Sequence, residues 1–409
     1  MLPGSRPTHS CSPMTTVLLA LLLITSSLLQ LQAQDPAAAA TATAADTAPN
    51  LNWLHARGNE AMTGLSPTQL NLPLELVWTF TTGDKARKEG VLATPVVKDG
   101  KVYIGGQSGR FYCIDLATGK EVWKVEKESA FEGNAGFSGN LVIAGCVDSF
   151  VYAWDATTGE EKWKFETRGE IHAGINTWKN AEGKEHVLIG SYDNLLYCLD
   201  AATGTKLWEY ETTNYINGAA AIYEDKVVFG GCDGMLYVID IATGKEVKTI
   251  EVGAYIGNNI AVDKGIAYIT HYGNKVAAFD FNDGTKLWEY GERDFPYYAA
   301  AAVSDEWVVA AGRDKRIRKL ERATGKEVWE FRTRGDIDGS PLICANQHVL
   351  FGSGDGYFYA LDLSNGEEKW RYEIGADIKV APAVAGNFIL VGADDGNVYC
   401  FKNVPSPAP

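Results

Sequence analysis

The chain has 409 residues, of which 46% are hydrophobic and 22% charged, and its formal net charge is −15 at pH 7. This composition is typical of a globular protein with a large core and argues against a disordered chain. The negative charge repels phosphate backbones and anionic lipid, so we expect no nucleic acid among the partners.

Residues 1–34 have the layout of a secretory signal peptide. Arg6 precedes the apolar run of residues 17–31, which ends shortly before Ala33, and this part of the chain contains no acidic residue. The run is shorter than the roughly 20 residues that span a bilayer, which favours cleavage over a membrane span. No cysteine directly follows it, so a lipid anchor is not indicated. We expect an exported, soluble protein of the periplasm or the medium.

The rest of the chain divides by composition. Residues 35–49 contain only Ala, Thr, Asp and Pro and are expected to be a linker. We assign residues 50–75 to an N-terminal strap, residues 76–404 to a repeat domain and residues 405–409 to a tail.

From Trp78 onward the sequence repeats with a period of roughly 40 to 45 residues, the length of one four-stranded propeller blade. Residues 227–245 are one copy: two apolar runs joined by an Asp-Gly turn and followed by an Asp-x-x-Thr-Gly turn. The residue that ends the second run recurs as Asp115, Asp155, Asp200, Asp240, Asp280, Glu321, Asp362 and Lys402. These copies predict an all-β, eight-bladed β-propeller of four-stranded antiparallel blades.

A turn glycine follows seven of these strands, at Gly119, Gly159, Gly204, Gly244, Gly284, Gly325 and Gly366. Four residues later the chain has a tryptophan in six copies and Lys248 in the seventh, and Trp78 supplies the eighth position. We interpret the tryptophans as structural groups that dock each blade on its neighbour, because one residue type recurs in register around the ring. They are Trp78, Trp123, Trp163, Trp208, Trp288, Trp329 and Trp370.

The two ends of the repeat region complement each other. Residues 396–401 form a strand with no turn and tryptophan strand after it, whereas residues 76–80 form a tryptophan strand with nothing before it. We expect the two to pair, so that the eighth blade combines both ends of the domain and closes the ring.

The cysteines after the predicted signal peptide fall at repeated positions, with Cys113, Cys198 and Cys400 sharing one. Equivalent positions on packed sheets lie about 10 Å apart, beyond the ~7 Å limit for a disulfide. We expect free thiols, and no motif suggests a zinc site. The basic run of residues 313–319 is expected to be a solvated strand face.

One column of residues is expected at the mouth of the axial channel, where each blade reaches the axis once. It consists of Leu92, Glu132, His172, Asn217, Gly257, Tyr297, Asp338 and Lys379. The binding candidates are Glu132, His172, Asn217, Tyr297, Asp338 and Lys379. The alternative is a water-filled channel that tolerates polar groups without binding anything specific.

The unit Gly-x-x-Tyr-x-x-Asp-x-x-Thr-Gly-Lys-x-x-Trp, repeated over residues 76–402, resembles the repeats of the pyrroloquinoline quinone (PQQ) propeller superfamily. Residues 52–59 and 63–66 resemble the N-terminal strap of bacterial PQQ-like repeat proteins. In size and blade number the chain is similar to the BamB branch, the periplasmic propellers of the outer-membrane β-barrel assembly machinery.

The resemblance implies two functions. A BamB-like protein would be a non-catalytic, cofactor-free scaffold that binds other envelope or secreted proteins, and we favour this function, with a monomeric chain. A quinoprotein dehydrogenase would hold PQQ and calcium on the axis, with Glu132 and Asn217 as metal ligands. Against it, residues 257–259 offer no carboxylate where the catalytic base would stand, and the chain has neither an adjacent cysteine pair nor an axial tryptophan.

A third alternative is a module that binds a polysaccharide or small ligand through Tyr215, Tyr255 and Tyr297.

Overall fold

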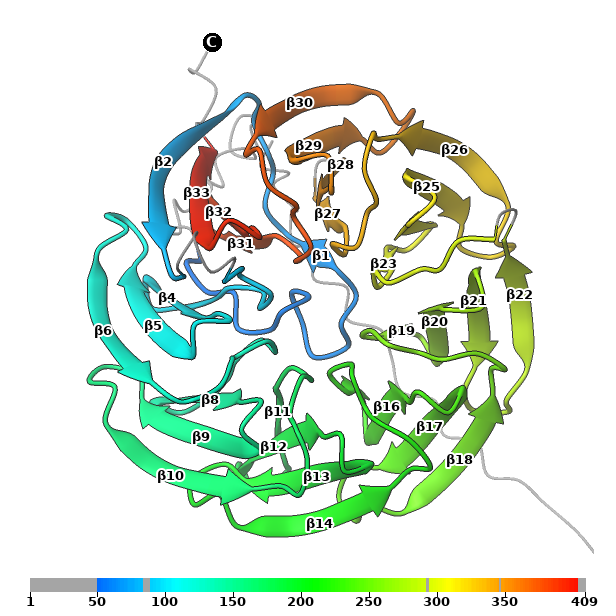
Figure 1. Ribbon diagram of the computed structural model, residues 1–409. Coiled ribbons are helices and arrows are strands. Elements are labelled where there is room, and N and C mark those ends of the chain that lie inside the picture. The colour runs from blue at the N-terminus through cyan, green and yellow to red at the C-terminus, as the bar shows by residue number, and fades with distance from the viewer. Residues whose placement is uncertain (1–49, 84–88, 292–293, 346, 404–409) are drawn as a thin grey trace, which may run out of the picture. The chain divides into compact units, whose positions relative to one another are not determined.

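The computed structural model describes residues 50–83, 89–291, 294–345 and 347–403, and the predicted signal peptide, the linker and the C-terminal tail lie outside them. The described residues form eight antiparallel sheets arranged as blades around a central axis (Figure 1). The prediction of an all-β, eight-bladed propeller is confirmed. The described residues contain no helix long and apolar enough to cross a bilayer.

Within blades 1 to 7 the four blade strands run in chain order from the axis outward. Blade 1 contains β3 (Val96–Lys98), β4 (Lys101–Gly105), β5 (Arg110–Asp115) and β6 (Glu121–Glu126). Blade 2 contains β7 (Gly136–Ser138), β8 (Leu141–Gly145), β9 (Phe150–Asp155) and β10 (Glu161–Glu166). Blade 3 contains β11 (Asn176–Lys179), β12 (Glu185–Gly190), β13 (Leu195–Asp200) and β14 (Lys206–Glu211). Blade 4 contains β15 (Ala221–Tyr223), β16 (Lys226–Gly230), β17 (Met235–Asp240) and β18 (Glu246–Glu251).

The second half of the ring repeats this order. Blade 5 contains β19 (Ala261–Asp263), β20 (Ile266–His271), β21 (Lys275–Asp280) and β22 (Lys286–Tyr290). Blade 6 contains β23 (Ala302–Val303), β24 (Trp307–Gly312), β25 (Arg316–Glu321) and β26 (Glu327–Arg332). Blade 7 contains β27 (Leu342–Cys344), β28 (His348–Gly352), β29 (Tyr357–Asp362) and β30 (Glu368–Glu373), with β1 (Leu65–Ser66) added in parallel to β27.

Blade 8 joins the two ends of the domain. It contains β31 (Ala383–Ala385), β32 (Phe388–Gly392) and β33 (Asn397–Asn403), and its outer strand is β2 (Leu74–Thr81). β2 pairs antiparallel with β33, with Trp78 opposite Cys400, and the two strands lie side by side in Figure 1. The prediction that the eighth blade is composite is therefore confirmed.

The position of a strand in its blade explains its sequence pattern. The third strand of each blade is covered on both faces by neighbouring blades, so β9, FVYAWD, is buried along its centre. The outer strand has one face toward solvent, so exposed and buried residues alternate in β10, EKWKFE, and Trp163 is its buried residue.

The position of its strand also corrects the expectation that the basic run of residues 313–319 is a solvated face. Arg318 and Lys319 lie in the third strand of blade 6 and are buried.

Six tryptophans contact the next blade in the same way. The indole N–H of Trp78 donates to Leu116 O at 2.9 Å, and a Cβ at Gly119 would lie 2.6 Å from the Trp78 ring. The turn glycine is thus needed for its positive φ and for the space that the indole fills. The other five tryptophans of this kind are Trp123, Trp163, Trp208, Trp288 and Trp329. Trp370 packs against Phe401 of blade 8 instead, with ring centroids 5.6 Å apart.

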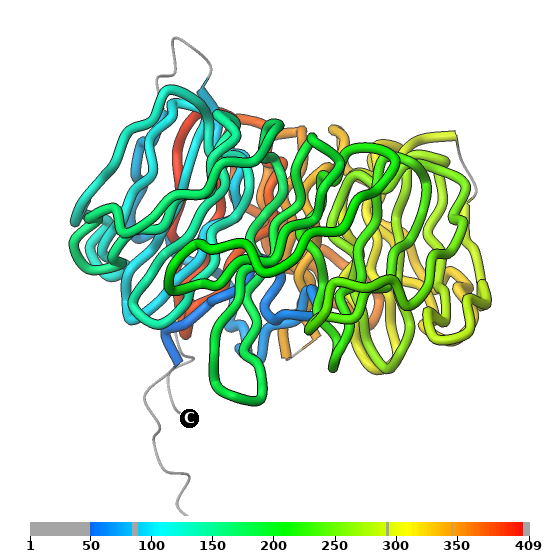
Figure 2. The backbone as a smooth tube through the Cα atoms, turned by 90° about the horizontal axis from the view of Figure 1, so that it is seen from below, coloured from blue at the N-terminus to red at the C-terminus, as the bar shows by residue number. Residues whose placement is uncertain are grey.

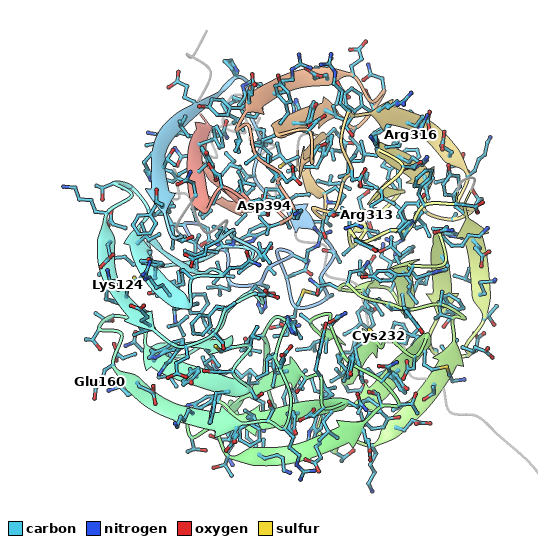
Figure 3. The ribbon with its side chains drawn as sticks, viewed as in Figure 1. Lys124, Glu160, Cys232, Arg313, Arg316 and Asp394 are labelled. Carbon is cyan, nitrogen blue, oxygen red and sulfur yellow. The ribbon has the colours of Figure 1, made fainter. Side chains whose placement is uncertain are left out.

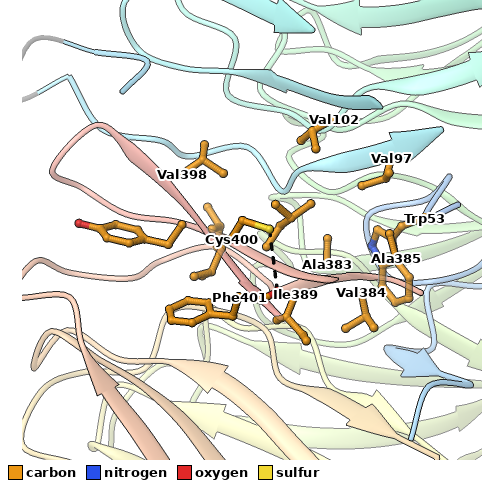
Figure 4. Packing of buried hydrophobic residues seen from close by; sticks show 14 of the residues in the cluster. Trp53, Val97, Val102, Ala383, Val384, Ala385, Ile389, Val398, Cys400 and Phe401 are labelled. Atoms are coloured by element: carbon orange, nitrogen blue, oxygen red, sulfur yellow. Dashed lines mark hydrogen bonds between the residues drawn. The ribbon is translucent and has the colours of Figure 1, made fainter. Parts of the chain in front are cut away.

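The predicted strap of residues 50–75 ends where β2 begins at Leu74, so residues 50–73 are called the strap from here on. They cross the axis at one end of the ring, the lower edge in Figure 2. Trp53 pairs with Val97 of β3 by two backbone hydrogen bonds of 2.8 Å and lies next to Val97 and Ala385 in the core of blades 1, 7 and 8 (Figure 4). Further along, the strap carbonyls of Glu60, Ala61 and Thr63 accept from the inner strands of blades 4, 5 and 6. The strap therefore satisfies the free edges of inner strands around the axis.

The six cysteines in the described part of the chain are free thiols, as expected from their register. Cys113, Cys146, Cys198, Cys344 and Cys400 are buried, and Cys232 is partly exposed. Burial raises the pKa of the Cys113 thiol to about 11, so that it stays protonated at neutral pH.

Candidate functional site

A cavity of about 170 Å³ lies on the propeller axis. Every blade lines it with the residue at one equivalent position of the segment that leads into its inner strand. These residues, here called the first axial column, are Leu92, Glu132, His172, Asn217, Gly257, Tyr298, Asp338 and Lys379.

A buried residue precedes each member of this column and fixes its direction. These anchors are Val91, Phe131, Ile171, Ile216, Ile256, Tyr297, Ile337 and Ile378. Because neighbouring side chains of an extended segment point in opposite directions, burial of the anchor turns the next residue toward the axis.

Tyr297 therefore does not belong to the column, and its predicted place at the channel mouth is wrong. Its ring is buried between blades 5 and 6, and its hydroxyl lies 3.5 Å from Arg318 Nη1. Tyr298 lines the cavity in its place. Both residues are tyrosines, so residue type alone did not separate them, but the run of large apolar anchors in the other blades identifies Tyr297 as the anchor.

A second column lies just outside the first and was not predicted. It contains the residue at the start of the turn after the second strand of each blade, which an aspartate follows in six of the eight blades. These residues are Gln107, Val147, Tyr192, Cys232, Tyr272, Arg313, Gly354 and Asp394. Figure 3 shows Cys232, Arg313 and Asp394 on the axial side of the blades, whereas Lys124 and Glu160 lie on the outer rim. A second alignment of the blades at this turn would have found the column.

Glu132 and His172 form an ion pair across neighbouring blades. His172 Nδ1 lies 2.7 Å from Glu132 Oε2, and Nε2 lies 2.9 Å from Glu170 Oε2. The hydrogen bond with Glu132 raises the pKa of His172, and the same bond lowers the pKa of Glu132. The imidazole is therefore held between two carboxylates in a partly buried position.

The other charged members of the first column are paired with the second column. Arg313 donates to both carboxylate oxygens of Asp338, at 2.9 and 2.8 Å, and its guanidinium lies 3.6 Å from the centre of the Tyr298 ring. Lys379 donates to Asp394. Asn217 approaches the Cys232 sulfur at 3.5 Å. The polar groups at the mouth thus bind mainly one another.

Aromatic residues surround one half of the mouth. The Tyr192 and Tyr215 rings are stacked 4.6 Å apart, and the His172 ring lies 4.4 Å from Tyr192. In blades 5 and 6 the Tyr272 and Tyr298 rings lie 4.4 Å apart, and Tyr272 N donates to Tyr255 O. We call these five tyrosines (192, 215, 255, 272 and 298) the tyrosine arc. Tyr215 and Tyr255 are 46% and 55% exposed, so the arc presents aromatic surface to solvent.

The closed end of the cavity is formed by the strap. Ala56 and Arg57 line it, together with Asn134, Asn258, Asn259 and Ser340 from the segments below the first column. Among the described residues no cluster of three or more His, Cys, Asp or Glu side chains could hold a metal ion.

Comparison with known proteins places this geometry in a family. The sequence model described as outer membrane protein assembly factor BamB matches residues 75–214, 148–247 and 192–402. Over 83 residues the chain is 29% identical to the outer membrane protein assembly factor BamB of Nitrosomonas eutropha, a match that covers 20% of each chain. Over 89 residues it is 29% identical to the quinoprotein alcohol dehydrogenase PedH of Pseudomonas putida, covering 20% of this chain and 15% of PedH.

The matched segments thus span about a fifth or less of the length of these two relatives. Solved structures resemble much more of the chain. The structure of BamB from Moraxella catarrhalis matches with a TM-score of 0.67 at 19% identity, and the match covers 83% of this chain and 100% of the BamB chain. The quinohemoprotein alcohol dehydrogenase from Comamonas testosteroni has a TM-score of 0.74 at 15% identity and covers 89% of this chain and 82% of its own.

At such identities the structures show a shared fold alone. The sequence model reaches further, because its matches together cover the repeats from residue 75 to residue 402. The chain is a PQQ-like propeller that belongs to the family of the outer membrane protein assembly factor BamB.

Proposed function

We propose that this protein is exported and serves as a non-catalytic scaffold that binds other proteins of the bacterial cell envelope. The proposal rests on the side chains at the mouth of the channel. Its charged side chains are paired with one another, and exposed aromatic residues beside them face outward. Such a surface offers contact area rather than free catalytic groups.

The tyrosine arc and its neighbours have the composition of a protein interface. Tyr272 is 38% exposed and Phe295 is 49% exposed, in addition to the exposed Tyr215 and Tyr255. Arg313 stacks on Tyr298 at the same mouth. Tyrosine, phenylalanine and arginine are enriched in protein interfaces, and tyrosine and arginine among the residues that contribute most to binding. The family description as an assembly factor supports a protein partner in the envelope.

The residues on the axis do not fit PQQ and calcium. The cavity of about 170 Å³ is smaller than the roughly 300–1,000 Å³ of typical organic-ligand sites. Glu132 is engaged by His172, and Asn217 contacts Cys232. Residues 257–259, Gly-Asn-Asn, provide no carboxylate that could act as a general base. We therefore derive no redox step for this chain.

Site-specific photocrosslinking in the envelope of the native host tests the scaffold role. A photoreactive phenylalanine analogue replaces Tyr255 on the tyrosine arc or, as a matched control, Val328 on the outer rim, which is 45% exposed. We expect a discrete adduct with an envelope protein from position 255 and none from position 328, and loss of the adduct when Tyr215 and Tyr272 are replaced by serine.

A second arm tests the enzymatic alternative with the same protein. The purified chain is titrated with PQQ and calcium, and the reduction of an artificial electron acceptor is followed with simple alcohols. Equal crosslinking at both positions, or alcohol-dependent turnover with bound quinone, would overturn the scaffold role.

A further inference from the structure

Arg57 is a buried cation on the propeller axis for which the scaffold role provides no explanation. Its side chain rises from the strap into the closed end of the axial cavity and is 1% exposed. Nη1 donates to Pro341 O at 2.7 Å, and Nη2 donates to Ala301 O at 2.9 Å. Gly64 leaves room for the guanidinium, since a Cβ there would collide with Nη2.

The surroundings of Arg57 leave its charge without a counter-ion. Its protein partners among the described residues are backbone carbonyls, and its Nε is buried without a hydrogen-bond partner. Burial lowers the pKa of Arg57 to about 9, so that the guanidinium remains mainly protonated at neutral pH. A buried charge without a paired charge, and a buried donor without an acceptor, are both unfavourable and call for a specific explanation.

The carboxylates that line the same cavity do not supply the counter-ion. Glu132 is bound by His172, and Asp338 accepts two hydrogen bonds from Arg313. Two polar side chains that line the cavity together with Arg57 have free donor groups. Asn259 Oδ1 accepts from Ala219 N, and Ser340 Oγ accepts from Ala300 N, so the Asn259 amide N–H groups and the Ser340 hydroxyl are left to donate into the cavity that they line.

We propose that the axial cavity binds a small oxyanion, a tetrahedral anion or the carboxylate of a short organic acid, with Arg57 as its cationic floor. The size of the cavity selects this class. About 170 Å³ corresponds to a few water molecules of roughly 30 Å³ each, which leaves room for such an anion. Arginine suits it because the planar guanidinium binds oxyanions through several N–H groups. This inference does not rest on the scaffold role.

Calorimetric titration of the full mature chain tests the proposal. Sodium sulfate, sodium phosphate and sodium acetate are titrated separately at constant ionic strength, which distinguishes tetrahedral anions from carboxylates. The variants are Arg57→Gln and the matched control Arg371→Gln, which removes the same charge from the half-exposed Arg371 on the outer strand β30. We expect saturable one-to-one binding by the wild type and Arg371→Gln, and at least tenfold weaker binding by Arg57→Gln.

Two results would overturn the proposal: no saturable binding of any of the three anions, or equal affinity in Arg57→Gln. If circular dichroism shows that Arg57→Gln does not fold, the proposal is tested by crystallography of the wild-type protein. In wild-type crystals grown with sodium bromide, an anomalous peak in the axial cavity beside the Arg57 side chain supports the site, and a cavity that contains only water rejects it. Crosslinking at Tyr255 is measured independently, so failure of one proposal does not imply failure of the other.

Discussion

Arg318 and Asp314 form a buried ion pair at a position where other blades have a hydrogen bond from a tyrosine hydroxyl to an aspartate. Arg318 Nη1 donates to Asp314 Oδ1 at 3.2 Å, Nη2 contacts the other oxygen, and the two side chains are 1% and 4% exposed. In five blades a tyrosine at the position of Arg318 donates instead to an aspartate four residues earlier; these tyrosines are Tyr152, Tyr197, Tyr237, Tyr359 and Tyr399. Blade 6 thus keeps the geometry of the repeat with a different chemistry.

Replacement of Arg318 is expected to depend on what takes its place. Arg318→Ala removes the guanidinium that donates to both oxygens of the buried Asp314, and we expect a loss of about 3–5 kcal/mol in the free energy of unfolding. Arg318→Tyr restores the hydrogen bond of the other blades and is expected to lose less than half as much. Urea denaturation, with midpoints compared at constant m, measures both. Equal losses in the two variants would show that the pairing with Asp314 is unimportant.

Lys248 occupies the position of the docking tryptophan in blade 4. Its ammonium donates to Asp283 O at 2.9 Å. A Cβ built on the turn glycine Gly284 would lie 3.6 Å from Lys248 Cδ, whereas a Cβ built on Gly244 would lie 2.6 Å from the Trp208 ring, so the contact at Lys248 is looser. We expect Lys248→Trp to fill this looser contact and to raise the free energy of unfolding by about 1 kcal/mol.

The reverse change is the control for this prediction. Trp208→Lys removes an indole that packs on Gly244 and donates to Ile241 O, and we expect a loss of about 3 kcal/mol. Thermal unfolding of both variants, followed by calorimetry, gives the two effects. A lower melting temperature for Lys248→Trp would contradict the docking role assigned to this position.

Trp53 fastens the strap to blade 1 and is 3% exposed. We expect Trp53→Ala to reduce the free energy of unfolding by about 3–5 kcal/mol, since it leaves a large cavity between the strap and the core. Asn52→Ala, which removes one exposed hydrogen bond to the Asp99 amide, should change it by less than about 1 kcal/mol. Similar urea midpoints for the two variants would mean that the strap adds little to stability.

His172 is expected to make stability depend on pH. Its pKa is raised in the folded state, mainly by Glu132, so its contribution is fully present below its ordinary pKa of 6.5 and is lost as the pH rises through the raised value. We expect the difference in unfolding free energy between the wild type and His172→Gln to shrink as the pH rises above about 6.5 and through the raised pKa.

This pH range excludes the titration of Glu132, because the pKa of its carboxyl is lowered below its ordinary value of 4.5. The difference is measured by urea denaturation at several pH values. Glu170→Gln keeps the hydrogen bond between His172 and Glu132. Its difference in unfolding free energy from the wild type should therefore change less with pH than the difference for His172→Gln. A difference that is constant or grows with pH would contradict the raised pKa.

Local patterns in the sequence were enough to predict the fold. Seven copies share the turn glycine and five blades share the aspartate-tyrosine spacing, and apart from β1 and β2 every strand pair within a blade joins strands that follow one another in the chain. The composite blade also followed from the sequence, because β33 ends without an outer strand and β2 begins without an inner one. Repetition makes such features visible, since a position in one blade can be checked against the others.

Tertiary structure decided the composition of the site. Tyr297 and Tyr298 are neighbours of the same residue type, and their burial assigns one to the core and the other to the axis. Arg318 belongs to a run that reads as a solvated face, but the third strand of a blade is covered on both sides. Arg57 reaches Pro341, 284 residues away in the chain, because the strap crosses the axis. Contacts between distant, non-repeating segments leave no periodic trace in a sequence, so only the folded ring brings these groups together.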